Sequence, residues 1–425
     1  MSERSTTTPP SQQPDADILI LGAGPAGMLC ALTAARRAKE NKTPREILLV
    51  DQDRTPARKL RASGGGRCNC TNQNAAPEHY ISANPRFTAQ ALKRLPPAQF
   101  LNLLQGLGLS ASQEDQGKMF CDQGAEALAL ALEKACRKAG CRFLLGRAVV
   151  GVIPPKEKGG LFTVDTHHGP LFAPRVVLAL GSPAWPALGG SDAIARLAGQ
   201  LGLTHIPARP ALTPLVLSGP ELQLARELTG LSVTTRLSLN AESACGGIAI
   251  TDSLLFTHQG LSGPAALRLS SYWRKGEPIS IDLAPEADVP ALLRQPGRGK
   301  ALARTILSEL MPRRLVEARL AALPKEFAAR ALGDRRIAEL SRVEMDALTS
   351  IVREWRITPR TTAGMAQAEA ASGGLDTDAF SAKTMQCKTI PGLFALGEAL
   401  DVAGDLGGYN LHWAWASGYA AGHAL

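Results

Sequence analysis

The chain has 425 residues, of which 45% are hydrophobic and 20% are charged, and its formal net charge is +9. At roughly 100–200 residues per domain, these values predict two or three packed domains and exclude fibrous and disordered classes of protein. No stretch reaches the ~18 apolar residues of a membrane helix, and the eight scattered cysteines form no CxxC pair, so we expect no membrane span, no metal site and no disulfide scaffold.

Residues 1–14, "MSERSTTTPPSQQP", are rich in Ser, Thr and Pro and contain no apolar run. This composition predicts a disordered leader rather than a secretory signal peptide. We therefore expect a cytoplasmic protein.

The first predicted strand, 17–21, leads through the glycine turn Gly22-Ala23-Gly24-Pro25-Ala26-Gly27 into an Ala/Leu-rich helix. The first glycine permits the tight turn, the second lets the backbone approach a pyrophosphate, and the third lets the helix pack closely on the strand. A second strand, 47–50, ends at Asp51, whose carboxylate can accept hydrogen bonds from a ribose diol. This pattern predicts a dinucleotide but does not choose between NAD and FAD.

The stretch 59–72, "KLRASGGGRCNCTN", favours FAD. Three consecutive glycines cannot lie inside a helix or strand, so Gly64 and its neighbours predict a backbone-rich loop able to follow a long ligand. Ser63 and Arg67 flank the glycines, and Arg67 could pair with the pyrophosphate. An enzyme that uses nicotinamide alone has no need of such a loop directly after the ribose-binding acid.

The middle of the chain predicts an inserted domain. A third buried strand, 176–180, ends at Gly181, after which residues 187–288 are rich in strand patterns and 289–355 are helical. We therefore expect a nucleotide-binding domain at 15–186 and 356–425, with a substrate domain at 187–355. No second GxGxxG occurs in the insertion, so NAD(P)H, if it is the reductant, must dock transiently. The basic stretch 313–342 is typical either of a solvated helix face or of a nucleic-acid surface.

The C-terminal stretch 392–422 predicts a last strand, 393–396, followed by Gly397 and Glu398. Gly407-Gly408-Tyr409-Asn410 then opens a helix of small residues that can lie close to a sheet. The positive N-terminal end of such a helix stabilises the negative charge of a reduced flavin. The two remote ends of the chain are thus expected to bracket one extended cofactor.

Four blocks of sequence resemble the HI0933-like flavoprotein family, which belongs to the glutathione-reductase-like FAD-binding proteins. They are "ILILGAGPAGMLCALTAARR", "KLRASGGGRCNCTN", "DSLLFTHQGLSGPAALRLS" and "TMQCKTIPGLFALGEALDVAGDLGGYNLHWAWASGYAAG". The resemblance implies an α/β fold: a discontinuous FAD-binding Rossmann domain with an inserted domain that is partly β-barrel-like and partly helical.

The resemblance also implies which residues bind FAD. The ADP half would be held by Gly22 to Gly27 and Asp51, and the adenine by the backbone of Val149. The rest of the cofactor would contact turn and loop residues: Lys59, Ser63, Gly64, Arg67, Cys68, Asn69, Gly181, Gly397, Glu398, Asp405, Gly408, Tyr409, Asn410 and Leu411.

Two residues are candidate catalysts. Cys68 lies in the glycine loop, where it is either a redox thiol, a proton donor or a small buried residue. His258, in "FTHQGLSGPA", is either a proton donor or acceptor near the substrate, or a structural histidine beside a glycine turn.

We expect an FAD-dependent oxidoreductase that uses NAD(P)H to reduce an activated C=C bond of a small molecule by hydride transfer through flavin N5. The alternatives are reduction of a uracil base in RNA, with RNA contact through the basic insertion, and oxidation of an amine or aminoketone by O2. Two further hypotheses are a non-catalytic flavin-binding redox sensor and an NAD dehydrogenase without flavin.

Overall fold

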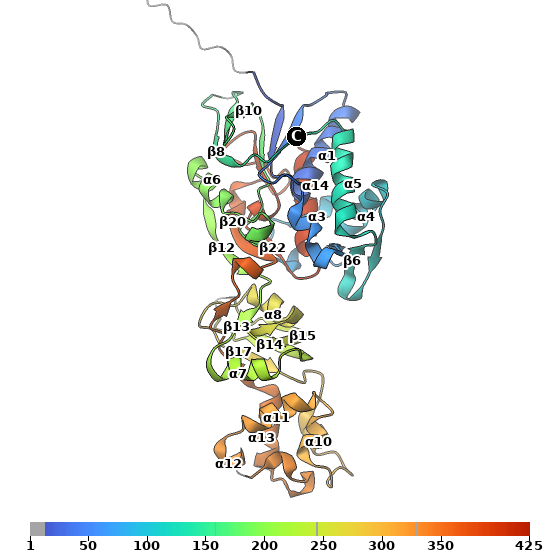
Figure 1. The fold of residues 1–425 in the computed structure, drawn as a ribbon, viewed down its shortest axis with the longest axis vertical. Helices are drawn as coiled ribbons and strands as arrows, with labels where there is room; N and C mark the ends of the chain where they lie inside the picture. The colour runs from blue at the N-terminus through green and yellow to red at the C-terminus, as the bar shows by residue number, and fades with distance from the viewer. Residues whose placement is uncertain (1–12, 158, 244, 329) are drawn as a thin grey trace, which may run out of the picture. The chain divides into compact units, whose positions relative to one another are not determined.

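The computed structural model describes residues 13–157, 159–243, 245–328 and 330–425, which divide into two compact units (Figure 1). Unit 1 comprises the described residues up to Arg209 together with Ala370–Leu425, and unit 2 comprises Pro210–Glu369. The chain therefore leaves unit 1, forms unit 2 and returns. Residues 1–12 of the expected leader lie outside the described part.

A five-stranded parallel sheet with strand order β21-β11-β1-β2-β7 forms the centre of unit 1. Its strands are short, nearly continuous apolar runs, as expected when helices cover both faces of a parallel sheet. They are β1 (Ile18–Leu21), β2 (Ile47–Asp51), β7 (Arg142–Leu145), β11 (Val176–Leu178) and β21 (Leu393–Ala395). Strand β1 continues through helix α1 to β2 on one side and pairs with β11 on the other. The order of the strands thus reverses at β1, where doubly wound α/β folds bind their ligands.

Helices α1 (Pro25–Glu40) and α14 (Tyr409–Gly422) pack side by side, although they come from opposite ends of the chain (Figure 1). Small residues allow the two backbones to touch. A side chain at Gly418 would overlap the carbonyl oxygen of Ala26, and a Cβ at Gly422 would lie 2.7 Å from the carbonyl oxygen of Cys30. Helix α5 (Gly124–Lys138) contacts α1 as well.

Smaller elements complete unit 1. Strands β3 (Asn69–Asn72), β5 (Ala111–Gln113) and β6 (Lys118–Cys121) form one small antiparallel sheet. Strands β8 (Val149–Ile153), β9 (Phe162–Thr166) and β10 (Leu171–Ala173) form another. The remaining elements are α2 (Arg58–Arg61), β4 (Tyr80–Ile81), α3 (Ala89–Arg94), α4 (Pro97–Gly106), α6 (Ala193–Leu201), β12 (His205–Ala211), β20 (Ala370–Leu375) and β22 (Ala403–Gly404).

Unit 2 has its own apolar core, shared by a seven-stranded sheet and a helical part. The sheet order is β18-β17-β14-β15-β16-β13-β19, and every pairing is antiparallel. Its strands are β13 (Leu215–Val216), β14 (Ser232–Leu239), β15 (Ala249–Thr257), β16 (Gly260–Ser262), β17 (Ile279–Asp282), β18 (Trp355–Ile357) and β19 (Thr361–Thr362). An antiparallel sheet of this kind is not a second dinucleotide-binding fold.

The helices of unit 2 fall into two groups. Helices α7 (Gly219–Glu227) and α8 (Gly263–Ser270) pack on the sheet. The other five form the helical part: α9 (Val289–Leu293), α10 (Ala303–Leu307), α11 (Arg313–Ala321), α12 (Lys325–Ala328) and α13 (Arg342–Arg353). Helix α13 joins the two parts because it contacts β17 and β18 as well as α9 and α11.

Both unit boundaries lie closer to the C-terminus than the domain boundaries expected at 187 and 355, because unit 2 begins at Pro210 and ends at Glu369. Residues 187–209 stay with unit 1 because α6 packs against β8 and β12 pairs with β20. Residues 356–369 stay with unit 2 because β18 pairs with β17 and β19 pairs with β13. Both shifts come from pairing with strands remote in sequence, which local pattern does not reveal.

All eight cysteines are free thiols. A search of the described residues finds no helix with both the length and the apolar character needed to cross a membrane.

The packing of α14 on α1 predicts that Gly418→Ala destabilises unit 1 by roughly 1–3 kcal/mol, because the new methyl group has no room. Gly199→Ala in α6 is the matched control, since no atom lies within 4 Å of its Cβ position and alanine favours helices. Thermal unfolding followed by the fluorescence of Trp413 and Trp415 on α14 measures both variants. An unfolding temperature of Gly418→Ala equal to that of the control would contradict the backbone contact.

Candidate functional site

Three turns meet at the carboxyl edge of the parallel sheet, where β1, β11 and β21 end. Ala179 N donates to Leu21 O at 2.8 Å, and Leu396 N donates to Leu178 O at 2.9 Å. A Cβ at Gly397 would lie 3.3 Å from the side chain of Ala26. The turns after β1, β11 and β21 are therefore next to one another.

The glycine turn after β1 has the geometry of a phosphate site. Gly22 has a φ of +112°, and any side chain there would overlap Ala179 O, so the turn requires glycine. At Gly24, by contrast, nothing lies within 4 Å of the Cβ position, which leaves an open approach to the backbone. Gly24 is the N-cap of α1, and neither a capping side chain nor an acidic residue occupies the first turn. The positive end of α1 is free to bind an anion.

Asp51 lies beside this turn at the end of β2. Its carboxylate accepts hydrogen bonds from Ala23 N at 2.7 Å and from Asp53 N at 2.9 Å, one on each oxygen. Burial raises the pKa of Asp51, while these two hydrogen bonds act in the opposite direction. Each oxygen keeps a lone pair, so the carboxylate can still accept from hydroxyl donors.

Glu398, in the turn after β21, ties three parts of the site together. Its carboxylate pairs with Lys59 at 2.7 Å and accepts from Ser182 Oγ at 3.0 Å. Ser182 directly follows Gly181, which has a φ of +74° and no atom near its Cβ position. These contacts hold the side chain of Lys59 against the carboxyl edge of the sheet.

The triple-glycine loop is an open stretch of backbone. Gly64, Gly65 and Gly66 all have positive φ and are exposed, and nothing lies within 4 Å of the Cβ positions of Gly65 and Gly66. Only glycine adopts three such conformations in a row without strain. Arg67 turns its guanidinium toward Glu114 and over the ring of Phe120, and its expected pairing with a pyrophosphate stays a prediction.

Strand β3, which follows the loop, lies against the start of α14. With its amide oriented to suit its neighbours, Asn69 accepts from Gly408 N at 3.2 Å and donates to Thr71 O at 3.0 Å. Asn72 Nδ2 donates to Gly407 O at 2.8 Å, and Trp415 Nε1 donates to Cys70 O at 2.8 Å. The N-terminal loop and the C-terminal helix are thus joined by hydrogen bonds across more than 300 residues of sequence.

Side chains around the start of α14 hold it in place. Tyr409 stacks on His79, with ring centroids 4.6 Å apart, and its carbonyl oxygen accepts from the hydroxyl of Tyr80 at 3.1 Å. Asn410 closes the preceding loop by bonding both the N–H and the C=O of Gly404. The N-cap residue of α14 is Gly408, which has no side chain to cap the first turn. Asp405 and Leu411 flank the turn and are partly buried.

Sequence reasoning missed His79 and Tyr80. Their segment carries no motif, and it reaches the site only because β4 pairs with β22. His412 is fully buried on α14 with its Nδ1 2.8 Å from Thr71 Oγ1, and burial lowers its pKa to about 4, so it is neutral at pH 7.

The two candidate catalysts have different surroundings. Cys68 is fully buried, and burial raises the pKa of its thiol to about 12, so it is uncharged at neutral pH. His258 lies in the exposed turn between β15 and β16 of unit 2, where Arg226 Nε donates to its carbonyl oxygen at 3.3 Å. No contact in the described residues assigns either one a chemical step, and both catalytic roles stay predictions.

Val149, the expected adenine contact, is buried in β8 at a β-bulge opposite Thr166. One edge of unit 1 brings together most of the residues expected to bind the cofactor. They are Gly22–Gly27, Asp51, Lys59, the glycine loop, Glu398 and the start of α14. Such an arrangement can bind a dinucleotide along its length, with the N-terminus of α1 at its central pyrophosphate and the N-terminus of α14 at one end.

Comparison with known proteins gives a consistent result. The HI0933-like protein Rossmann domain matches residues 16–424. The chain is 37% identical over 412 residues to a ribosomal RNA dihydrouridine synthase of Escherichia coli K12, across 96% of this chain and 98% of that protein. It is 28% identical over 421 residues to a 3-dehydro-bile acid delta(4,6)-reductase of Clostridium scindens, across 95% and 98% of the two chains.

A solved structure has the same fold. The 3-ketosteroid delta1-dehydrogenase of Sterolibacterium denitrificans, in complex with 1,4-androstadiene-3,17-dione, matches with a TM-score of 0.50. The match covers 96% of this chain and 99% of that one, at 12% identity.

The buried His412 predicts an acid-sensitive unit 1. Above its ordinary pKa of 6.5 the ring is neutral in both the folded and the unfolded chain and has no effect on pH dependence. As the pH falls from 6.5 toward 4, only the unfolded chain takes up the proton, which favours unfolding by about 1.4 kcal/mol per pH unit at most. Between pH 7 and pH 4.5, we expect the free energy of unfolding of the His412→Asn variant to fall by less than that of the unchanged chain. Unfolding of unit 1 followed by fluorescence measures both. Equal losses would contradict a neutral, buried imidazole.

Proposed function

The chain belongs to the HI0933-like family of FAD-dependent oxidoreductases, and we propose that it binds FAD in unit 1 and reduces a uracil base in ribosomal RNA to dihydrouracil. The observation that carries the proposal is the meeting of the β1 glycine turn, the triple-glycine loop and the start of α14, in a chain that is 37% identical to a ribosomal RNA dihydrouridine synthase.

The residues at this edge fit FAD. The open backbone at Gly24 and the uncapped end of α1 suit the pyrophosphate, and the free lone pairs of Asp51 suit the adenosine ribose. The exposed glycine loop and the Lys59–Glu398 pair can line the middle of the cofactor, and the start of α14 can meet the pyrimidine edge of the flavin. When bound, FAD supplies hydride transfer at its N5 atom.

The proposed reaction places demands on the chain's own residues. Reduction of the C5=C6 bond of uracil adds a hydride at C6, which is conjugated to the C4 carbonyl, and a proton at C5. The protein must therefore hold the base against the flavin, exclude water and deliver one proton. Cys68 and His258 remain the candidate donors; burial raises the pKa of the Cys68 thiol to about 12, which keeps it protonated but makes it a weak acid.

We propose NAD(P)H as the source of the hydride, docking transiently. Within the described residues the sheet of unit 2 is antiparallel throughout and offers no second dinucleotide fold.

A second candidate function is reduction of a conjugated C=C bond in a steroid-like molecule. The 28% identity to a 3-dehydro-bile acid reductase supports it. The charge distribution of unit 2 favours RNA instead. Residues 289–355 contain 13 basic and 8 acidic residues, whereas residues 210–288 contain 5 basic and 8 acidic residues. A basic end on an otherwise acidic unit suits a polyanionic substrate better than an apolar one.

Gly24→Ala tests the cofactor site without disturbing the fold. The Cβ position is empty and the backbone conformation suits alanine, so we expect an unchanged unfolding temperature of the apoprotein. The added methyl group occupies the approach to the pyrophosphate, so FAD affinity is expected to fall at least roughly tenfold, or about 1.4 kcal/mol. Gly106→Ala in α4, which also has an empty Cβ position, is the control. FAD titration calorimetry measures both, and equal affinities would place the pyrophosphate elsewhere.

The reaction itself is tested with the FAD-loaded protein, NADH or NADPH, and in vitro transcribed ribosomal RNA that carries no modifications. Nuclease digestion and mass spectrometry should detect uridine that has gained two hydrogen atoms. A conjugated 3-ketosteroid is assayed in parallel. Reduction of the steroid with no change in the RNA would overturn the uracil assignment. Failure of NAD(P)H to bleach the flavin would contradict the proposed reductant and favour the oxidase or sensor interpretation.

A further inference from the structure

Two segments of unit 2 with a high content of basic residues are joined through their backbones. Leu302 and Arg336 form an antiparallel bridge, and Ala303 N donates to Arg335 O at 3.0 Å. Two further hydrogen bonds, Ile337 N to Ala301 O and Ala338 N to Gly299 O, extend the pairing. Residues 299–303 therefore run beside residues 335–338. We call the basic segments that contain them, 298–304 and 330–344, together the arginine surface.

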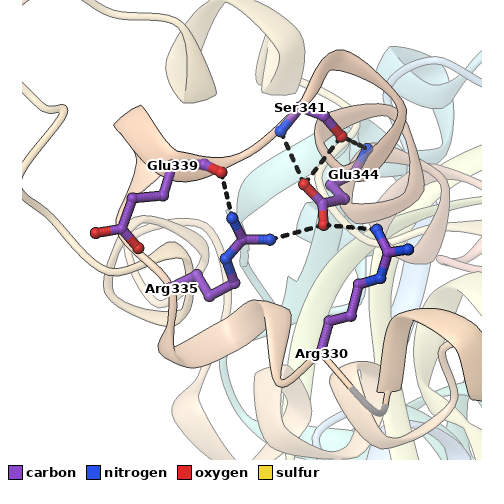
Figure 2. A network of polar contacts seen from close by, with 5 residues as sticks. All are labelled: Arg330, Arg335, Glu339, Ser341 and Glu344. Atoms are coloured by element: carbon purple, nitrogen blue, oxygen red, sulfur yellow. Dashed lines mark hydrogen bonds and ion pairs between the residues drawn. The ribbon is translucent and has the colours of Figure 1, made fainter.

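Glu344, near the start of α13, organises this surface (Figure 2). The side chain of Glu344 is only 4% exposed, and its carboxylate pairs with Arg335 at 2.7 Å and with Arg330 at 3.3 Å. It also accepts from the backbone N–H of Ser341 at 2.8 Å and from its hydroxyl at 2.9 Å. These hydrogen bonds and the nearby arginines lower the pKa of Glu344 to about 2. A buried carboxylate that is charged at neutral pH holds two arginines in fixed positions.

The network provides hydrogen-bond donors for the carboxylate of Glu344 and leaves other N–H donors of the arginines available. A guanidinium has five N–H donors, and Arg330, whose side chain is 61% exposed, uses one nitrogen on Glu344. Arg335 also donates to Glu339 O. The N-terminus of α13 is closed by the capping box of Ser341 and Glu344, so an anion would have to bind here through side chains.

The arginine surface has an excess of positive charge. Its two segments contain seven basic and three acidic residues. Glu344 is taken up by the network and Asp334 pairs with Arg304 at 2.7 Å, which leaves the exposed carboxylate of Glu339 as the remaining acid. In the described residues, the side chains of Lys300, Arg336 and Arg342 are exposed and make no hydrogen bond or ion pair.

We propose that the arginine surface binds the phosphate backbone of the RNA substrate, with Arg336 and Arg342 as its main phosphate contacts. The identity of the polyanion as RNA rests on the proposed function. Exposed guanidinium groups that are not committed to a carboxylate are the usual partners of phosphate, because their planar donors match its oxygens. Contacts of this kind set affinity and orientation but not base identity.

The test compares two double variants that change the net charge equally. Arg336→Gln with Arg342→Gln removes the two free arginines of the surface. Arg294→Gln with Arg313→Gln is the control, because Arg294 pairs with Asp346 at 3.5 Å and Arg313 pairs with Glu317 at 2.9 Å. Filter binding to in vitro transcribed ribosomal RNA over a series of salt concentrations gives the affinity and its salt dependence.

We expect the first variant to bind RNA at least roughly tenfold more weakly at low salt, with a log–log salt slope reduced by about 2, since each phosphate contact contributes about one. The control should bind within about twofold of the unchanged protein, because its arginines are engaged in ion pairs. Arg336→Lys with Arg342→Lys keeps the charge and should retain most of the affinity. Equal losses in the first variant and the control would overturn the proposal in favour of a general charge effect, and no loss in either would overturn it outright.

The same samples separate this inference from the proposed function. Reduction of uridine by the unchanged protein, with the same KM for RNA in the Arg336→Gln, Arg342→Gln variant, would contradict the arginine surface and leave the function standing. Salt-dependent binding lost in that variant, with no dihydrouridine formed by any protein, would support the surface and contradict the function. The rate of flavin reduction by NAD(P)H without RNA should be the same in all variants.

Discussion

Close approach of backbones at α14 is the constraint on which the structure of unit 1 depends. Gly418 and Gly422 let α14 touch α1, and Gly408 lets its first turn touch β3, where a side chain would overlap Thr71 O. At each of these points a backbone carbonyl oxygen lies within 2.7 Å of the Cβ position, and it cannot move aside as a flexible side chain could. Residues from the two ends of the chain are thereby held at one edge of the sheet. The arrangement of that edge depends on these glycines more than on any polar contact.

The two units contribute different features to the proposed function. Unit 1 forms its edge from turns after β1, β11 and β21 together with the glycine loop, all of which belong to segments outside the insertion. Unit 2 is inserted into the chain of unit 1 between Arg209 and Ala370. Its charges are unevenly distributed: the helical part is basic and the sheet part is acidic. The proposed reduction of a base within a large RNA would require both a site for the cofactor and a surface that holds phosphates.

The sequence predicted the parts of the fold that depend on local pattern. The strand–glycine turn–helix at 17–27, the triple glycine at 64–66 and the small-residue helix after Gly408 all occur where they were expected, because each requires a residue type that few other structures need. Contacts between distant segments could not be predicted in this way. The stack of His79 on Tyr409 and the pair of Thr71 with His412 join residues with no shared motif. The same limit applies to the unit boundaries, which depend on β12 pairing with β20, and to the ion pairs of Glu344, whose helical pattern alone suggests an ordinary solvated face.

An experimental structure of the protein with FAD bound tests the central claim most directly. The account predicts the pyrophosphate at the N-terminus of α1 beside Gly24, the adenosine ribose at Asp51, and the pyrimidine edge of the isoalloxazine at the first turn of α14 beside Gly408. A flavin bound at another place in the chain, or a ring whose pyrimidine edge lies away from α14, would contradict it.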